Sequence, residues 1–252
     1  MPLPLLGKLS SAELLCWLRS TAAPSARPRQ RAVRGRSMRI LAIADIHGGS
    51  EVYEWLVESA ARHQSDLVVL AGDLFSAGWE EEQREQAQTI LIPLLKRISA
   101  PVFHIMGNDD NVVLGYEDDQ IRPLHGRRLS CGNSHFVGYQ FTPPFVGAVF
   151  VKPESEIEKD LRSLEPLLDR NTVLVTHTPA FGTLDECSGG EHVGSPSLAA
   201  LLDRNPVLAH IHGHIHGRFG REGRHFNVAA AGRRRAFMIE LPALDFRVLE
   251  RE

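Results

Sequence analysis

Short apolar runs rich in β-branched residues recur along the chain from Met38 onward, and the earlier ones leave room for helices between them. Six such runs come first: Arg39–Ala44, Asp66–Ala71, Pro101–Met106, His135–Phe141, Thr172–Thr176 and Val207–Ile211. Apolar residues at three- and four-residue steps predict helices at Glu51–His63, Glu80–Ser99 and Glu154–Leu168, and Ser195-Pro196 has the form of a helix start. Short strands are expected at His225–Val228, Ala236–Leu241 and Phe246–Leu249. Strands that alternate with helices and then follow one another predict an α/β sandwich with mixed sheets.

The body of the chain is long and apolar enough for one large domain. Of its 252 residues, 43% are hydrophobic and 23% are charged. No apolar run approaches the ~20 residues that a membrane-spanning helix needs. The three cysteines, Cys16, Cys131 and Cys187, are odd in number and lack metal-ligand spacing, which favours a reducing compartment. We therefore expect a globular protein without a membrane span, with the cytoplasm as the default location.

Residues 1–37 differ in composition from the rest of the chain. They hold seven Lys or Arg residues against Glu13 alone, although the formal net charge of the whole chain is −3. We predict a disordered basic extension at residues 1–37 and a single domain at residues 38–252. The extension resembles an organellar targeting segment. The favoured alternative is that Met38, which directly precedes the first strand, is the true start.

Polar side chains follow five of the predicted strands, each on a turn built from Gly, Asn, Asp or Pro. These turns have the sequences ADIHGG, AGDLF, MGNDDN, VTHTP and HGHIHG. Ligands of open α/β sheets bind beyond the carboxyl ends of the strands, so turns far apart in the sequence can meet there. Carboxylate and imidazole groups are common ligands of divalent metal ions. We therefore expect the five turns to converge on one metal centre.

Taken in order, the motifs D-x-H, G-D, G-N-x-D, H and G-H-x-H resemble those of the calcineurin-like metallophosphoesterases. In this chain they are Asp45-Ile46-His47, Gly72-Asp73, Gly107-Asn108-Asp109-Asp110, His177 and Gly213-His214-Ile215-His216. The resemblance extends from Met38 to Leu241. It implies a four-layer α-β-β-α sandwich of two mixed sheets flanked by helices, and activity as a metal-dependent phosphoric ester hydrolase.

The resemblance also implies two divalent metal ions. One would be held by Asp45, His47, Asp73 and His216, and the other by Asp73, Asn108, His177 and His214. Asp73 is the expected bridge, because a shared carboxylate offsets part of the repulsion between two cations ~3.5–4 Å apart. Mn²⁺ is the favoured ion, and Fe, Zn or Co ions suit the same nitrogen and oxygen ligands. A hydroxide bridging the two metals would attack phosphorus in line.

The stretch HIHGHIHG places four histidines at alternate positions. By the match to G-H-x-H, His214 and His216 are expected to be ligands, one for each metal. His210 and His212 are expected to share one face of a strand, in packed or hydrogen-bonded positions. His212 is also a candidate for holding the tautomer of a ligand.

One position departs from the family's usual pattern. Most members have a histidine that is thought to protonate the leaving group where this chain has Asp109. Asp73, Asn108 and Asp109 are the expected catalytic residues, but an aspartate with a reference pKa of ~3.9 is ionised at pH 7 and cannot donate a proton. The general acid therefore stays open. A leaving group that needs little protonation favours phosphodiesters, with cyclic nucleotides as candidates, over monoesters, and Asp110 is expected to orient the turn.

The segment from His177 to Gly220 resembles a branch of the family that includes bacterial proteins and brain-expressed animal relatives, which act on phosphodiesters. The match keeps Gly182, Asp185, Gly190, His192, Val193, Gly194, Pro206 and Gly213. The loop from Thr178 to Gly194 would cover the metal centre, and His192 is the candidate substrate-contacting residue, with a plain surface role as the alternative. Ala180 and the FNVAAAG stretch around Asn227 depart from the branch.

Other classes of function stay open. A catalytically weak scaffold or binding protein on the same fold is the main alternative, because the usual histidine at position 109 is missing, although the complete ligand set counts against it. A nuclease would use the basic extension and Arg233-Arg234-Arg235. Since the domain is acidic and those arginines suit a solvated turn, we expect a small phosphoester, such as a nucleotide, as the partner, and neither a nucleic acid nor a membrane. A histidine-rich zinc store would not need five motifs. The natural substrate, the native metal and the oligomeric state are not specified by the sequence.

Overall fold

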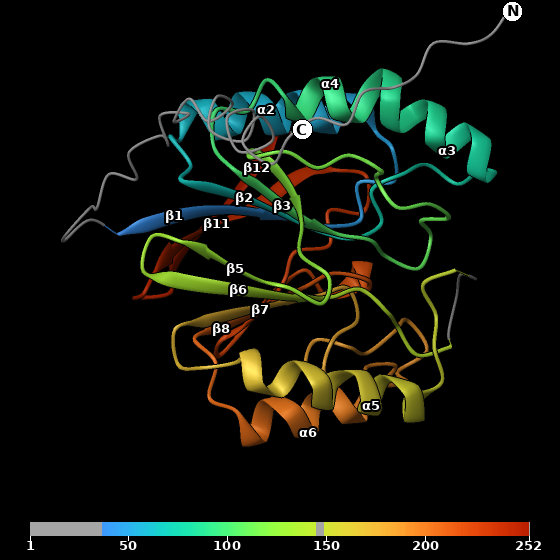
Figure 1. Ribbon diagram of the computed structural model, residues 1–252, viewed down its shortest axis with the longest axis vertical. Helices are drawn as coiled ribbons and strands as arrows, with labels where there is room; N and C mark the ends of the chain where they lie inside the picture. Colours follow the sequence, from blue (N-terminus) through green and yellow to red (C-terminus); the bar gives the residue numbers. More distant parts are fainter. Residues whose placement is uncertain (1–36, 145–148, 252) are drawn as a thin grey trace, which may run out of the picture. The chain divides into compact units, whose positions relative to one another are not determined.

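The computed structural model describes residues 37–144 and 149–251. The chain divides into two units, residues 1–34 and residues 35–252, and all described residues belong to the second. The predicted basic extension therefore lies outside the described residues, apart from its last position. Two six-stranded sheets with flanking helices form the second unit (Figure 1).

The first sheet has the strand order β12-β11-β1-β2-β3-β4. Its strands are β1 (Met38–Ile43), β2 (Leu67–Ala71), β3 (Val102–Ile105), β4 (Ile121–Pro123), β11 (Arg234–Leu241) and β12 (Asp245–Arg251). β1 to β4 run parallel to one another, whereas β11 is antiparallel to β1 and to β12. The carboxyl ends of β1, β2 and β3 consequently lie along one edge of this sheet.

The second sheet has the order β5-β6-β7-β8-β10-β9. Its strands are β5 (Arg128–Cys131), β6 (Ser134–Tyr139), β7 (Thr172–Thr176), β8 (Ala209–His212), β9 (Gly220–Glu222) and β10 (His225–Asn227). β6, β7, β8 and β10 are parallel, and the two edge strands, β5 and β9, are antiparallel to their neighbours. The carboxyl ends of β7 and β8 thus also share an edge.

Helices cover the outer face of each sheet (Figure 1). The first sheet is covered by α2 (Ser50–Arg62), α3 (Glu80–Gln86) and α4 (Ile92–Leu95), and the second by α5 (Glu154–Leu164) and α6 (Pro196–Arg204). The two-residue period of β1 explains the packing, since Leu41 contributes to the core beneath the helices and Ile40 to the core between the sheets. No helix of the described ranges is long and apolar enough to span a membrane.

The two sheets face each other across a second apolar core. Phe103 of β3 and Phe136 of β6 meet there edge to face, with their ring centroids 5.6 Å apart. Both side chains are almost completely buried. This packing produces four layers in the order helix, sheet, sheet, helix, and confirms the predicted fold class.

The predicted helix at Glu80–Ser99 is confirmed as one continuous helical segment, but it ends at Leu95 and is not α-helical throughout. The segment consists of α3, a π-helical turn (Ala87–Leu91) and the short α4. Pro93 lacks an amide hydrogen, and its ring would clash with the carbonyl of Thr89, so a regular α-helix cannot pass this point. A π-helical turn widens the helix there. The short strands β4, β5 and β9 were not predicted, because their sequences, IRP, RLSC and GRE, form no apolar run.

Candidate metal centre

The predicted ligands lie on tight turns at the carboxyl ends of the central strands. Asp45, His47, Asp73 and His214 all have positive φ angles, between 50° and 71°. Such backbone conformations cost non-glycine residues about 1–3 kcal/mol each and are concentrated at functional sites. The turns therefore aim these side chains into one place at the expense of local stability.

Glycines next to the ligands allow the turns to pack closely. A Cβ atom on Gly107 would lie 2.2 Å from Oδ1 of Asp73, and one on Gly213 would lie 2.4 Å from Oδ2 of Asp45. Both distances are far below van der Waals contact, so only glycine fits at these positions. The glycines of the G-N and G-H motifs are thus required by the approach of the carboxylates from another strand.

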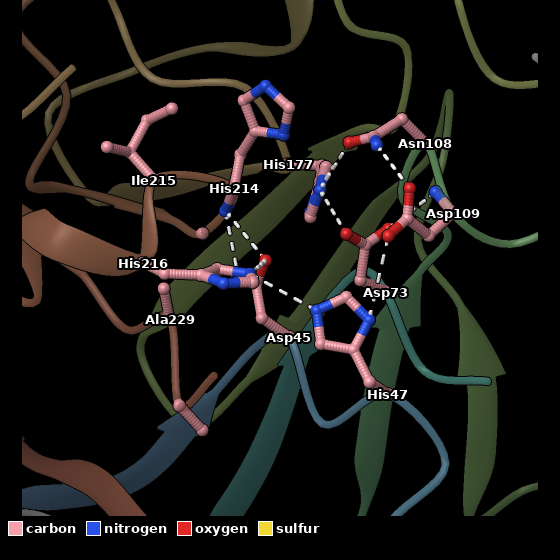
Figure 2. Close-up of polar contacts among 12 residues, drawn as sticks. Asp45, His47, Asp73, Asn108, Asp109, His177, His214, Ile215, His216 and Ala229 are labelled. Carbon is pink, nitrogen blue, oxygen red and sulfur yellow. Dashed lines mark hydrogen bonds and ion pairs between the residues drawn. The ribbon is translucent and has the colours of Figure 1, made fainter. Parts of the chain in front are cut away.

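One group of ligand atoms is formed by Asp45, His47 and His216 (Figure 2). Nε2 of His216 lies 3.1 Å from Oδ1 of Asp45 and 3.1 Å from Nε2 of His47. Asp45 is fully buried, whereas the side chain of His216 is 46% exposed. Two imidazole nitrogens and a carboxylate oxygen that face one point in this way are a suitable ligand set for a divalent cation.

A second group contains Asp73, Asn108 and His177 (Figure 2). Nε2 of His177 lies 3.2 Å from Oδ2 of Asp73 and 3.0 Å from Oδ1 of Asn108. The other ring nitrogen of His177, Nδ1, lies 2.8 Å from the carbonyl oxygen of Ala71. When Nδ1 donates a proton to that carbonyl, the lone pair of Nε2 is directed at Asp73 and Asn108.

Asp73 and Asp45 connect the two groups. Ligand atoms of Asp45, Asp73 and His177 all lie within 4.8 Å of one another. The spacing is small enough for two neighbouring cations to share a carboxylate. The described residues therefore fit a centre of two metal ions.

His214 lies beside the second group. Its backbone N–H donates to Oδ1 and Oδ2 of Asp45, at 3.2 and 3.0 Å. Its ring is T-shaped to that of His177, with the centroids 5.2 Å apart. The structure thus brings all seven predicted ligands together at the carboxyl ends of β1, β2, β3, β7 and β8. His214 lies outside the tightest groups of ligand atoms.

The pKa shifts of Asp73, His177 and His216 show that positive charge is favoured among the predicted ligands. Burial alone would raise the pKa of Asp73, but protonated His177 and the backbone N–H of Asp109 lower it to about 2. Burial would lower the pKa of His177, whereas Asp73 raises it to about 10. The hydrogen bond to Asp45 likewise raises the pKa of His216. The buried carboxylates therefore favour positive charge at this position, which divalent cations would supply.

Asp110 joins two of the ligand-bearing turns. It is completely buried, and it accepts hydrogen bonds from the backbone N–H groups of Leu74, Phe75 and Gly107 at 2.8–2.9 Å. Burial raises the pKa of Asp110 above its usual range, with a further contribution from the charge of Asp73. The contacts agree with the expected role of Asp110 in orienting the turn.

His210 and His212 lie within β8 and away from the ligand groups. His210 lies 2.8 Å from Oγ1 of Thr176 and 3.1 Å from Nδ1 of His225. Nδ1 of His212 lies 3.3 Å from the carbonyl oxygen of Gly213, and its Nε2 is buried without a hydrogen-bond partner among the described residues. His212 touches no ligand side chain through a hydrogen bond, which supports the packed role over the tautomer-holding one.

Two alanine variants distinguish the predicted metal ligand His214 from the packed His212. We expect His214→Ala to reduce bound metal, because it removes an imidazole from the second group, and His212→Ala to keep the wild-type metal content. Metal per protein after dialysis, measured by atomic emission, checks both. Loss of metal from His212→Ala to the same extent as from His214→Ala would contradict the packed role of His212.

His192 is held by a buried carboxylate. Its Nδ1 lies 2.6 Å from Oδ1 of Asp185, and Oδ2 of Asp185 accepts from the backbone N–H groups of Gly182 and Gly194 at 3.0 Å. Hydrogen bonding to Asp185 raises the pKa of His192. The exposed Phe181 ring packs against the half-exposed ring of His192. The ring of His192 is thus partly exposed, and its orientation is set by Asp185.

The loop that carries His192 is tied to the turn of the last two ligands. The side-chain amide of Asn227 donates to the carbonyl oxygens of Leu184, at 3.4 Å, and Ile215, at 2.9 Å. Arg218 donates to the carbonyl oxygen of Glu186 at 3.2 Å. Asn227 therefore connects the loop to the metal centre even though the residues after it depart from the branch pattern.

Arg235 is a residue whose role the sequence did not reveal. Its guanidinium donates to the carbonyl oxygens of Ala229, at 2.8 Å, and His216, at 3.2 Å, and stacks on the ring of Phe219 at 4.3 Å. The expectation of a solvated turn is thus wrong for Arg235, which supports the His216 turn. In the sequence, Arg235 is one of three consecutive arginines, and nothing there distinguishes it from Arg233 and Arg234.

Comparisons with known proteins agree with the fold. Residues 38–218 match the calcineurin-like phosphoesterase family. The crystal structure of TT1561 of Thermus thermophilus is similar, with 17% sequence identity, a TM-score of 0.65, and coverage of 85% of this chain and 99% of that one. A dimetal phosphatase from Danio rerio is similar, with 14% identity, a TM-score of 0.58 and the same coverage. No curated protein matches the sequence.

Proposed function

The chain belongs to the calcineurin-like phosphoesterase family, and from this premise we propose that it hydrolyses phosphodiesters at a centre of two divalent metal ions. Membership of the family makes it a metal-dependent phosphoesterase. The observation that carries the proposal is the meeting of two groups of ligand atoms, Asp45 with His216 and Asp73 with His177, at distances of 3.1–3.2 Å. The Danio rerio structure, a dimetal phosphatase of the same fold, agrees with two ions.

We assign Asp45, His47, Asp73 and His216 to one ion, and Asp73, Asn108, His177 and His214 to the other. These residues offer nitrogen and oxygen without thiolate, a set that suits Mn²⁺, which we propose as the preferred ion, as well as Fe, Zn and Co ions. When bound, two such ions supply a water of lowered pKa and neutralise charge on the phosphoryl oxygens. The buried Asp73 would hold both ions at a fixed separation.

The residues around the centre favour a diester. The position that most family members fill with a proton-donating histidine holds Asp109, whose oxygens face an amide and an imidazole nitrogen. A diester with a good leaving group needs less proton donation than a monoester. Nucleotide diesters are candidates, and we propose that His192, oriented by Asp185, contacts the substrate from the loop after β7. The cytoplasm stays the default prediction for the location of the protein.

The test compares two esters of the same phenol. We expect the protein, loaded with Mn²⁺, to hydrolyse a bis-aryl phosphodiester faster than the aryl phosphomonoester, and a chelator to abolish both activities. Asp109→His restores the usual histidine and should raise monoester turnover relative to diester turnover. His192→Gln should raise KM for the diester and leave the metal content unchanged.

Two outcomes would count against the proposal. A faster monoester reaction in the wild type would refute the diester preference, while leaving the metal-dependent esterase intact. Absence of turnover with Mn²⁺, Fe²⁺, Zn²⁺ and Co²⁺ would favour the scaffold alternative. An unchanged KM in His192→Gln would place that histidine outside the substrate site.

A further inference from the structure

Asp109 contacts a ligand of the second metal through one of its oxygens. The side-chain NH₂ of Asn108 donates to Oδ1 of Asp109 at 2.7 Å. This hydrogen bond determines which way the Asn108 amide points, because the NH₂ group must face Asp109 and the amide oxygen must face the other way. The amide oxygen accordingly lies 3.0 Å from Nε2 of His177, on the side of the metal centre (Figure 2).

The other oxygen of Asp109 faces a ligand of the first metal. Oδ2 lies 3.7 Å from Nδ1 of His47. The opposite nitrogen of that ring, Nε2, lies 3.1 Å from Nε2 of His216 (Figure 2). A carboxylate beside Nδ1 favours the tautomer with its proton on that nitrogen, which leaves the lone pair of Nε2 for a cation.

Asp109 is itself held in place from two sides. Its backbone N–H donates to Oδ1 of Asp73 at 2.9 Å, and its carbonyl oxygen accepts from the side chain of Gln83 at 3.0 Å. Gln83 is buried and also accepts from the backbone N–H of Asn111 at 2.6 Å. The backbone of Asp109 is therefore fixed on both sides, which holds the base of its side chain beside Asn108 and His47.

We propose that Asp109 is a positioning residue that orients one ligand of each metal, the amide of Asn108 and the ring of His47. The proposal rests on the two-metal centre of the proposed function. Ligand atoms of His47, Asp73 and Asp109 do lie within 4.8 Å of one another, so direct ligation by Asp109 has to be weighed. The orientation of His47 argues against it, since Asp109 lies on the Nδ1 side of the ring and the ligand group with His216 lies on the Nε2 side.

The first test measures metal binding without any reaction. Titration calorimetry of metal-stripped protein with Mn²⁺ should show affinity about 10–100-fold weaker in Asp109→Ala than in the wild type, the range found when such outer partners of metal ligands are removed. Asp109→Asn keeps an oxygen that can accept from Asn108 but carries no charge beside His47. It should therefore bind Mn²⁺ with intermediate affinity.

Asp119→Ala is the matched control, because it removes an exposed carboxylate from the same region of the chain. It should bind Mn²⁺ as the wild type does. Circular dichroism of each variant shows that the fold is kept, and the isosteric Asn variant guards against misfolding of Asp109→Ala. Wild-type affinity in both Asp109 variants would overturn the proposal.

The second test separates positioning from proton donation. In a series of aryl phosphodiesters with leaving groups of rising pKa, a positioning role predicts that Asp109→Asn slows every ester by a similar factor. A proton donor predicts a loss that grows with the pKa of the leaving group. A growing loss together with unchanged Mn²⁺ affinity would refute the positioning role. A wild type that binds no Mn²⁺ would refute the proposed function itself, and with it this inference.

Discussion

Asp73→Asn is expected to lower kcat for phosphodiester hydrolysis by at least roughly 10³-fold and to leave the protein with less than its full complement of metal. Asp73 is 2% exposed, and its carboxylate faces Nε2 of His177 at 3.2 Å and accepts from the backbone of Asp109 at 2.9 Å. An amide carries no charge to place between two cations. Loss of the several kcal/mol that such ions contribute to transition-state stabilisation corresponds to about a thousandfold or more in rate.

Metal content and kcat are measured on the same preparation, with Mn²⁺ supplied at increasing concentration. Asp119→Asn, which changes an exposed carboxylate, should match the wild type in both. Recovery of wild-type kcat in Asp73→Asn at high Mn²⁺ would mean that Asp73 contributes affinity only. Full activity with two bound ions at low Mn²⁺ would contradict its place as the shared ligand.

Asp110→Ala should produce the largest loss of stability among the variants of this centre. The buried carboxylate accepts from Leu74 and Phe75 through Oδ1 and from Gly107 through Oδ2, at 2.8–2.9 Å. Alanine would leave three buried N–H groups without an acceptor, and each unsatisfied group costs about 1–3 kcal/mol. We therefore expect the free energy of unfolding to fall by roughly 3–6 kcal/mol, after allowance for partial access of water.

Urea unfolding in the presence of a chelator measures this loss without a contribution from bound metal. Asp110→Asn should lose less, because its oxygen can still accept from Leu74 and Phe75, while its NH₂ group faces the N–H of Gly107. A drop below about 1 kcal/mol for Asp110→Ala would show that other acceptors replace the carboxylate.

The sequence predicts the position of the candidate metal centre because the predicted ligands follow the ends of strands. Asp45, Asp73 and His177 come directly after buried apolar runs, and parallel strands end at a common edge. The family motifs added the pairing of ligands with ions. His192 was identified by the same resemblance, and its contact with the substrate stays a prediction.

Other features depend on contacts between residues far apart in the sequence. The orientation of the Asn108 amide depends on Asp109 and His177, and the support of the His216 turn depends on Arg235. Hydrogen bonds of this kind have no period in the sequence. The π-helical turn at Ala87–Leu91 was not predicted either, because three- and four-residue spacing of apolar side chains does not distinguish it from an α-helical turn.

The sequence by itself determined the α/β class of this protein and the chemical types of its predicted ligands, because the periods of strands and helices and the identity of a side chain are local properties. Only the tertiary structure decided which nitrogen of His47 and His177 faces the centre, and that Asp110 ties the Asp73 turn to the Asn108 turn. The physical reason is that ring and amide orientations follow from the donors and acceptors around them, and folding brings those partners from distant strands.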